Sequence, residues 1–286
     1  MAAAIITDSN SGILGNEEWE NEIYVIPMPV ILDGRTYYEG QNMTHEQFYR
    51  FLEEHKPIST SQPAPADIME TWEKALESGY EEIVYIPMSS SLSSSFQTAR
   101  MLADEYDGKV QVVDNHRISV TQKQSVKDAL WLAEKGCIAA EIREELEKTA
   151  YDSIIYVGVE TLEYLKKGGR ITPAAAAMGT LLSLKPLLTL QGGKVDAYAK
   201  VRGSRTCKKR LIETMQKSVD QFHERGIEIS VGAAGSFSDK EGDWEWLEMI
   251  KEAFPGEEIH YDPLTFSIGC HVGPGAFGMG ISRKIG

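Results

Sequence analysis

The chain has 286 residues, of which 42% are hydrophobic and 25% charged, a balance typical of a globular protein with a sizeable core. Its net charge of -14 repels a phosphate backbone, so the composition argues against nucleic acid as a partner. No apolar stretch approaches the length of a membrane span, and the first residues lack the positively charged start of a signal peptide. Cys137, Cys207 and Cys270 have no metal-ligand spacing and are expected to be reduced, buried thiols. We therefore expect a cytoplasmic protein without a metal, a cofactor or stable membrane insertion.

The first half of the chain alternates predicted strands with predicted helices. Strands are expected at residues 3–7, 22–32, 81–87 and 109–114, and helices at 66–78, 95–106 and 119–135. Residues 35–40 are expected to pair back on 22–32 across a turn at Asp33–Gly34. Thr44 and Gln47 have the spacing of a capping box, which predicts a helix start. Repeated strand–loop–helix units indicate a parallel sheet covered by helices.

The pattern changes after about residue 152. Strands are predicted at 153–158, 227–234 and 257–262, and helices at 160–167, 173–183, 204–224 and 243–253. Residues 185–202 are interpreted as an antiparallel hairpin with a Gly-Gly turn. We therefore expect two α/β domains: residues 1–150 with a parallel sheet flanked by helices, and residues 151–286 with a mixed sheet and helices. No linker marks the boundary, which is approximate.

The stretch PMSSSLSSSFQTAR, from Pro87 to Arg100, contains six serines between a predicted strand and a predicted helix. A flexible linker would be unusual at this position. Ser94 and Gln97 have capping-box spacing, which predicts that Ser93–Ser95 lie at a helix N-terminus, where free N–H groups and the helix dipole favour an anion. Serines that only cap the helix are the alternative.

A nucleophilic serine is a third interpretation of the same loop. The chain contains no G-x-S-x-G motif, and no glycine flanks these serines. His271 and Asp114 are the residues that would complete a triad. A serine-dependent hydrolase or acyltransferase using Ser93 and His271 is therefore kept as the alternative function.

Two other loops also carry hydroxyl groups. Thr60 and Ser61 follow an extended run, and Asp8 and Ser9 follow the first strand. Because ligands of open α/β sheets bind outside the carboxyl ends of the strands, three such loops predict one polar pocket at one sheet edge. Three ordinary helix caps are the alternative.

Glycine and basic motifs follow in the second half. GPGAFG at 273–278 matches a dinucleotide-binding pattern, but only eight residues remain after it, so its glycines are interpreted as close backbone approaches or strand bends. In YLKKGGRI, Lys166 and Lys167 complement the dipole of a helix that ends at Gly168–Gly169, and Arg170 is placed to point into a cleft.

A basic cluster follows the predicted hairpin. It is either a solvated face or a docking surface for an acidic partner. Its members are Lys200, Arg202, Arg205, Lys208, Lys209 and Arg210.

Together and in this order, the motifs resemble the DegV family of bacterial fatty-acid-binding proteins over nearly the whole chain. The motifs that carry the resemblance are IITDSNSGI, TSQPAPAD, MSSSLSSSFQTA, VVDNHRISVTQ, YLKKGGRI, LLSLKPLL, KVRG and HVGPGAFG.

The resemblance implies that a long-chain fatty acid lies in a closed apolar tunnel. It implies that Thr60 and Ser93 hold the carboxyl group. Ser61 and Ser94 would supply further donors, and Arg170 and His271 would complete the polar network. These six residues are the candidate carboxyl-binding site.

The resemblance also implies a partner protein, the catalytic subunit of a fatty acid kinase, which phosphorylates the bound acid for phospholipid synthesis. Arg202 would lie on the surface that docks this kinase. The chain itself is expected to be a binding subunit and not an enzyme, since it shows no motif for ATP or Mg²⁺.

The sequence departs from the family pattern at four single positions and in the segment VTQKQ (120–124), which lacks the glycines usual there. Ser94 and Ser95 stand where the family usually has Gly and Thr, Ala64 stands where it has Ser, and Asn115 where Ser or Thr is common. Loss of the serine at Ala64 predicts a following helix without a side-chain cap.

Overall fold

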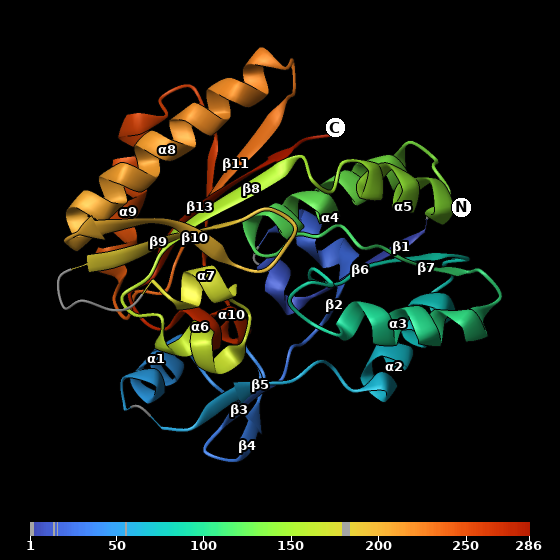
Figure 1. The fold of residues 1–286 in the computed structure, drawn as a ribbon. Helices are drawn as coiled ribbons and strands as arrows, with labels where there is room; N and C mark the ends of the chain where they lie inside the picture. Colours follow the sequence, from blue (N-terminus) through green and yellow to red (C-terminus); the bar gives the residue numbers. More distant parts are fainter. Residues whose placement is uncertain (1–2, 14, 16, 55, 179–183) are drawn as a thin grey trace.

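The computed structural model describes residues 3–13, 15, 17–54, 56–178 and 184–286 (Figure 1). Three sheets organise these residues: a four-stranded parallel sheet, a six-stranded mixed sheet and a three-stranded antiparallel sheet. The predicted fold class, a parallel sheet and a separate mixed sheet flanked by helices, is confirmed. The division into domains 1–150 and 151–286 stays a proposal.

The parallel sheet has the strand order β2-β1-β6-β7, formed by Ile23–Ile26, Ala4–Asp8, Ile83–Ile86 and Val110–Val112. Its central strands β1 and β6 are buried along their whole length because helices cover both faces. Helices α2 (Pro65–Glu77) and α3 (Ser95–Ala103) pack on one face, and α4 (Val120–Glu134) and α5 (Ala139–Lys148) on the other (Figure 1). Helix α5 lies outside the predicted elements.

The mixed sheet has the order β10-β9-β8-β13-β11-β12. Its strands are Asp196–Arg202, Leu184–Leu190, Ser153–Gly158, Phe277–Arg283, Ile229–Gly235 and Ile259–Pro263. Neighbours pair antiparallel except β11 and β12, and the predicted hairpin is β9–β10. Helices α8 (Ser204–Glu224) and α9 (Lys240–Ala253) cover one face, with Trp246 and Phe277 in the core between them and the sheet.

The third sheet has the order β4-β3-β5, formed by Arg35–Tyr37, Val30–Leu32 and Ile58–Thr60. The predicted strand 22–32 is therefore two strands in different sheets, because Pro27 and Pro29 interrupt it and a proline has no N–H to donate. Helix α1 (His45–Glu53) lies beside this sheet, and its Phe48 stacks on Phe266 with ring centroids 4.3 Å apart.

The small sheet packs against helices from the second half of the chain. These are α6 (Glu163–Gly168) and α10 (Phe266–Val272), which meet β3, β5 and α1 at the bottom of Figure 1. Helix α10 and strand β13 lie outside the predicted elements. Helix α7 covers Pro173–Ala176; residues 179–183 of the helix predicted at 173–183 lie outside the described residues. Three short 3-10 helices, η1 (Ser9–Ser11), η2 (Glu18–Glu22) and η3 (Asp104–Tyr106), complete the elements in the described ranges.

The helix caps test three local predictions. The capping box at α1 is confirmed: the Gln47 N–H donates to Thr44 Oγ1 over 3.3 Å, and the Thr44 N–H donates to Gln47 Oε1 over 2.9 Å. The box predicted at Ser94 is wrong. Ser94 has φ -80° and ψ 2°, not the extended conformation that aims a capping side chain at the helix, and its hydroxyl makes no capping bond. Helix α2 begins after Ala64 without a side-chain cap, as predicted.

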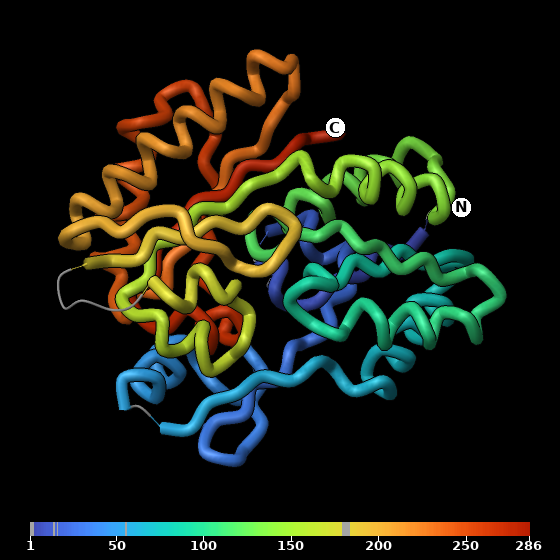
Figure 2. The backbone as a smooth tube through the Cα atoms, viewed as in Figure 1, coloured from blue at the N-terminus to red at the C-terminus, as the bar shows by residue number. Residues whose placement is uncertain are grey.

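The C-terminal tail returns to the parallel-sheet half of the molecule (Figure 2). The Ile285 N–H donates to Asp128 Oδ1 of α4 over 3.1 Å. Among the described residues, no helix has the length and apolar composition needed to cross a membrane. Within the same residues, no group of His, Cys, Asp or Glu side chains is placed to hold a metal ion.

Candidate fatty-acid site

An apolar cavity of about 100 Å³ lies between the mixed sheet and the loops of the parallel sheet. Strands β8 and β11 contribute Ile155, Val157 and Ala234, and the hairpin contributes Leu190 and Val195. The other lining residues are Met88, Leu92, Ile118, Ser119, Val120, Leu165, Arg170, Leu264, Ile268, His271, Val272, Gly278 and Met279. Nearly all of these side chains are apolar, so the lining suits hydrocarbon. Ligand pockets usually measure about 300–1,000 Å³, so a long acyl chain requires this cavity to widen.

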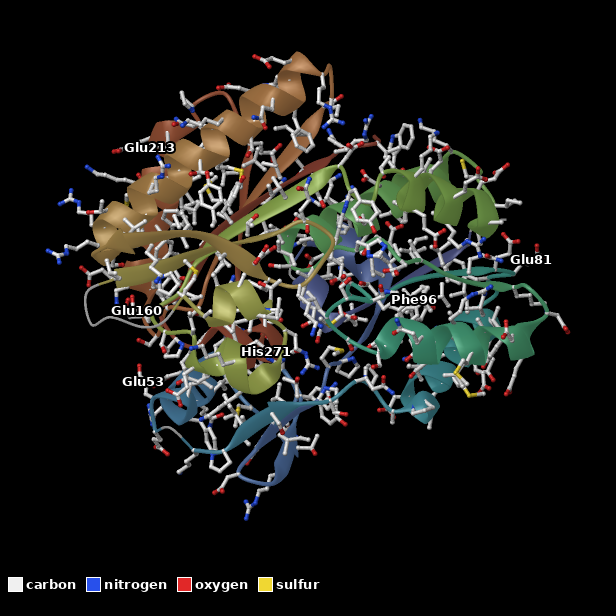
Figure 3. All side chains as sticks on the ribbon, in the orientation of Figure 1. Glu53, Glu81, Phe96, Glu160, Glu213 and His271 are labelled. Carbon is white, nitrogen blue, oxygen red and sulfur yellow. The ribbon has the colours of Figure 1, made fainter. Side chains whose placement is uncertain are left out.

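A polar pocket of about 110 Å³ adjoins this cavity. It is lined by Ile58, Ser59, Thr60, Tyr164, Lys167, Gly168, Arg170, Cys270 and His271. Arg170 and His271 line both spaces, so they stand at the junction between the apolar cavity and the polar pocket. Figure 3 shows His271 near the middle of the view, where α6, α10 and the three-stranded sheet come together.

The end of helix α6 positions Arg170. Gly169 adopts the left-handed conformation (φ 69°) that ends the helix, as the Gly-Gly pair predicts. Arg170 Nε then donates to the Leu92 carbonyl over 3.0 Å, and Nη1 donates to the Gly168 carbonyl. A guanidinium has five N–H groups, so others remain for a ligand at the junction.

His271 is held between Thr60 and Gly168. Its Nε2 lies 3.0 Å from Thr60 Oγ1, although the two residues are 211 positions apart. Gly168 permits the contact, because a Cβ at this position would lie only 2.1 Å from His271 Nδ1. Burial, and to a lesser degree the charge of Arg170, lowers the pKa of His271 to about 4. The imidazole is therefore neutral near pH 7, and its buried Nδ1 has no hydrogen-bond partner among the described residues.

Acid should destabilise the protein through His271. Between its usual pKa of about 6.5 and its folded pKa of about 4, the unfolded chain binds a proton that the folded protein does not. Stability from this residue is present at neutral pH and is lost as the pH falls through that window. Urea unfolding at pH 7 and pH 4.5 should show that the native protein loses roughly 2 kcal/mol more than His271→Gln. Equal losses in the two proteins would contradict the buried, neutral imidazole.

The other predicted hydroxyl residues occupy different positions. Ser93 Oγ lies 2.8 Å from Ser95 Oγ and accepts from the Ser95 N–H over 3.2 Å, and Ser93 is not among the lining residues of either space. Its neighbour Leu92 lines the apolar cavity and accepts from Arg170. Ser61 and Ser94 are exposed. The structure thus brings together Thr60, Arg170 and His271, with Ser93 one residue from the lining.

The residues of the alternative hydrolase are engaged elsewhere. Ser93 pairs with Ser95, and His271 Nε2 pairs with Thr60; no hydrogen bond joins Ser93 to His271 in the described part of the chain. No observation on the geometry favours serine catalysis over binding.

The three hydroxyl loops do not meet at one sheet edge, although the sequence predicted that they would. Thr60 ends β5 of the three-stranded sheet, not a strand of the parallel sheet. Asp8 and Ser9 support backbone: Asp8 Oδ2 accepts from the Met88 N–H over 2.7 Å, and Ser9 Oγ accepts from the Met28 N–H over 3.0 Å. Complete burial raises the pKa of Asp8 to about 6. Asp8 thus fixes the loop of Met88 and Ser9 the segment at Met28, and neither residue lines either space.

Several lining residues were not recognised as functional from the sequence, Ser59, Lys167 and Gly278 among them. Lys167 was interpreted only as a helix-end lysine, yet it lines the polar pocket. Gly278 lies in β13 and lines the apolar cavity. Gly278 could have been found from the sequence FGMGI at 277–281. Large side chains alternate there with glycines, which is the period of a strand that has side chains on one face and glycines on the other.

Arg202 lies at the exposed end of β10, away from both spaces. Lys200, Arg205, Lys209 and Arg210 are exposed nearby in sequence. Lys208 does not belong to this surface: it is buried on α8, and its Nζ lies 2.8 Å from Glu245. We call the exposed residues Lys200, Arg202, Arg205, Lys209 and Arg210 the basic patch.

Known proteins resemble this chain over its whole length. A family model described as an uncharacterised protein of the DegV family matches residues 2–284. A DegV domain-containing protein of Deinococcus radiodurans is 31% identical over 287 residues, which are 98% of each chain.

Solved structures agree. One, described as showing fatty acid binding of a DegV family protein from Thermus thermophilus, has 30% identity and a TM-score of 0.86 over 99% of this chain and 100% of that one. A fatty acid binding DegV family protein from Streptococcus agalactiae has 27% identity and a TM-score of 0.84 over 99% of each chain. With its family model, its relatives and its fold in agreement, the chain belongs to the DegV family.

Proposed function

We propose that the protein binds a long-chain fatty acid, with the acyl chain in the apolar cavity and the carboxylate at the junction formed by Arg170, His271 and Thr60. One observation carries the proposal: a nearly wholly apolar cavity ends at an arginine and a histidine that also line a polar pocket. An amphiphile with one anionic end matches this arrangement. The fatty acid binding described for the Thermus thermophilus and Streptococcus agalactiae proteins supports it.

The energetics of such a ligand divide between its two ends. Each buried methylene contributes about 0.8 kcal/mol, so the acyl chain supplies most of the affinity. Burying a carboxylate without partners is costly, and the guanidinium of Arg170 offsets that cost. If Thr60 donates to His271 Nε2, the neutral ring carries its proton on Nδ1, and that N–H is free to donate to the carboxylate.

Ser93, Ser61 and Ser94 remain in the proposal as outer donors. Ser93 is linked to the junction through Leu92, whose carbonyl accepts from Arg170. The exposed Ser61 and Ser94 would act only after a loop rearrangement or through water.

Native mass spectrometry tests the proposal. The purified protein should carry a mass increment of one fatty acid, which organic extraction removes and added palmitate restores. A protein that neither co-purifies with a fatty acid nor binds palmitate after extraction would rule the proposal out.

We propose further that a separate kinase subunit phosphorylates the bound carboxyl in the cytoplasm, which would supply acyl phosphate for phospholipid synthesis. The basic patch supports a docked partner, since its five exposed cations lie between residues 200 and 210 of a chain whose net charge is -14. An acidic surface on the kinase would be the complementary partner.

Arg202→Glu should therefore weaken the kinase complex without changing fatty acid affinity. Reversing one charge in a docking patch should lower the affinity for the kinase by roughly tenfold, mainly through the association rate, because rim charges steer encounter. Surface plasmon resonance with the kinase subunit measures this effect, and palmitate titration provides the control. The prediction fails if the variant binds the kinase as tightly as the native protein does.

A further inference from the structure

The polar pocket extends beyond the proposed position of the carboxylate. A carboxylate at Arg170 and His271 lies at the junction, whereas Ser59, Thr60 and Lys167 line only the polar pocket. Ser59 and Lys167 are exposed, so this side of the pocket meets solvent. Because the Thr60 hydroxyl is engaged with His271, the pocket offers the Ser59 hydroxyl and the Lys167 ammonium group outward from the site of the carboxyl.

The reaction proposed above changes the charge of the head group. An oxygen of the carboxylate attacks the γ-phosphorus of a nucleoside triphosphate brought by the kinase. The bond from that phosphorus to the bridging oxygen breaks, and the nucleoside diphosphate leaves with the electron pair. No proton moves, and the acyl phosphate carries two negative charges where the acid carried one. Arg170 supplies one positive charge at the junction, so the product needs a second cation further out.

We propose that the polar pocket is the phosphoryl subsite for the acyl phosphate product, with Lys167 as its cation and Ser59 as its hydroxyl donor. The inference rests on the proposed function. Lys167 is available for this role because its ion pair with Glu163, 2.9 Å long, lies on the surface, where both side chains are more than half exposed. Such surface pairs are weak and are readily exchanged for a phosphate.

The end of helix α6 disfavours an anion at this place, and Arg170 offsets part of that effect. The C-terminus of a helix is its negative end, and Gly168 lines the pocket. However, the Gly168 carbonyl accepts from Arg170 Nη1, so its oxygen is directed to a cation and not left facing a phosphoryl group.

Binding of two matched ligands tests the subsite. The ligands are palmitate and the methylene analogue of palmitoyl phosphate, in which CH₂ replaces the oxygen between carbonyl and phosphorus. Lys167→Gln should lower the affinity for the analogue about tenfold, because a charge-assisted contact is lost, and should leave palmitate affinity within twofold. Lys167→Arg should restore the affinity for the analogue. Lys166→Gln is the control, because it removes the neighbouring exposed lysine, which does not line the pocket. It should leave the affinities for both ligands unchanged.

The outcomes separate this inference from the proposed function. If the native protein binds palmitate but Lys167→Gln weakens both ligands equally, or neither, the phosphoryl subsite is wrong while fatty acid binding stands. If the native protein binds neither ligand, both proposals fail. A selective loss of the analogue, strongest at low salt and rescued by arginine, supports the subsite.

Discussion

Arg170→Gln is expected to reduce palmitate affinity about 100-fold while leaving hexadecanol affinity nearly unchanged. Arg170 lines both the apolar cavity and the polar pocket, and its guanidinium is the charge placed to meet the carboxylate. Removing one partner of a charged hydrogen bond at a half-buried site costs roughly 2–3 kcal/mol, which corresponds to about 30- to 150-fold. Hexadecanol has the same chain length without the negative charge. The ratio of palmitate affinity to hexadecanol affinity should therefore be much smaller in the variant than in the native protein.

Displacement of a fluorescent fatty acid from delipidated protein measures both affinities. Lys194→Gln is the matched control, since it removes a cation that donates to the Gly169 carbonyl over 3.1 Å but lines neither space. It should bind palmitate normally. Arg170→Lys keeps the charge without the planar fork and should fall between the native protein and Arg170→Gln. Palmitate affinity within threefold of native in Arg170→Gln would remove Arg170 from the head-group site.

Local signals predicted most of the elements because they lie within single segments of sequence. The bounds expected for α8, 204–224, are those of the structure, since Gly203 precedes a long run of regularly spaced apolar residues such as Leu211 and Met215. Strands β1 and β6 were recognisable as short apolar runs next to polar loops, which is the pattern of strands buried on both faces.

Strand β13 could not be recognised in the same way. Its residues Gly278 and Gly280 alternate with large side chains, and glycine is depleted in strands, so the glycines of GPGAFG were interpreted as close backbone approaches or strand bends. The structure supplies the reason for Gly280: a Cβ there would lie 2.9 Å from Val120 and from Thr121, where α4 packs on the sheet. The glycine is therefore required by tertiary packing against α4, which the local sequence does not show.

The site was only partly predictable because it joins distant segments. The sequence and the family resemblance led to Thr60, Arg170 and His271, and the structure brings these together. What neither could provide is that Thr60 arrives on a separate small sheet, or that Ser93 turns its hydroxyl to Ser95. Ser94 is also explained: its φ of -80° is open to any residue, so the position does not require the family's usual glycine.

Gly278 gives the second prediction, because it lines the apolar cavity without a side chain. In β13 it pairs with Val157 of β8 and Ala234 of β11, and all three residues line the cavity. Its φ lies outside the left-handed region, so the backbone does not require glycine there. A Cβ at Gly278 would approach Tyr156 O at 3.1 Å and Val157 at 3.6 Å. A larger side chain would therefore extend into the cavity, in the space proposed for the acyl chain.

A graded series at Gly278 should therefore lower palmitate affinity in proportion to side-chain size. At about 0.8 kcal/mol for each displaced methylene, Gly278→Ala should lower palmitate affinity about fourfold and Gly278→Leu, which adds four carbons, about 200-fold. Gly256→Leu is the control, because Gly256 is exposed, has no atom within 4 Å of an added Cβ and should bind palmitate normally. Thermal unfolding of the delipidated variants separates lost binding from lost folding. A variant that keeps the native melting temperature is folded, so its lower palmitate affinity comes from the cavity space that the new side chain occupies. Equal palmitate affinity across the folded series would mean that the acyl chain does not pass over β13.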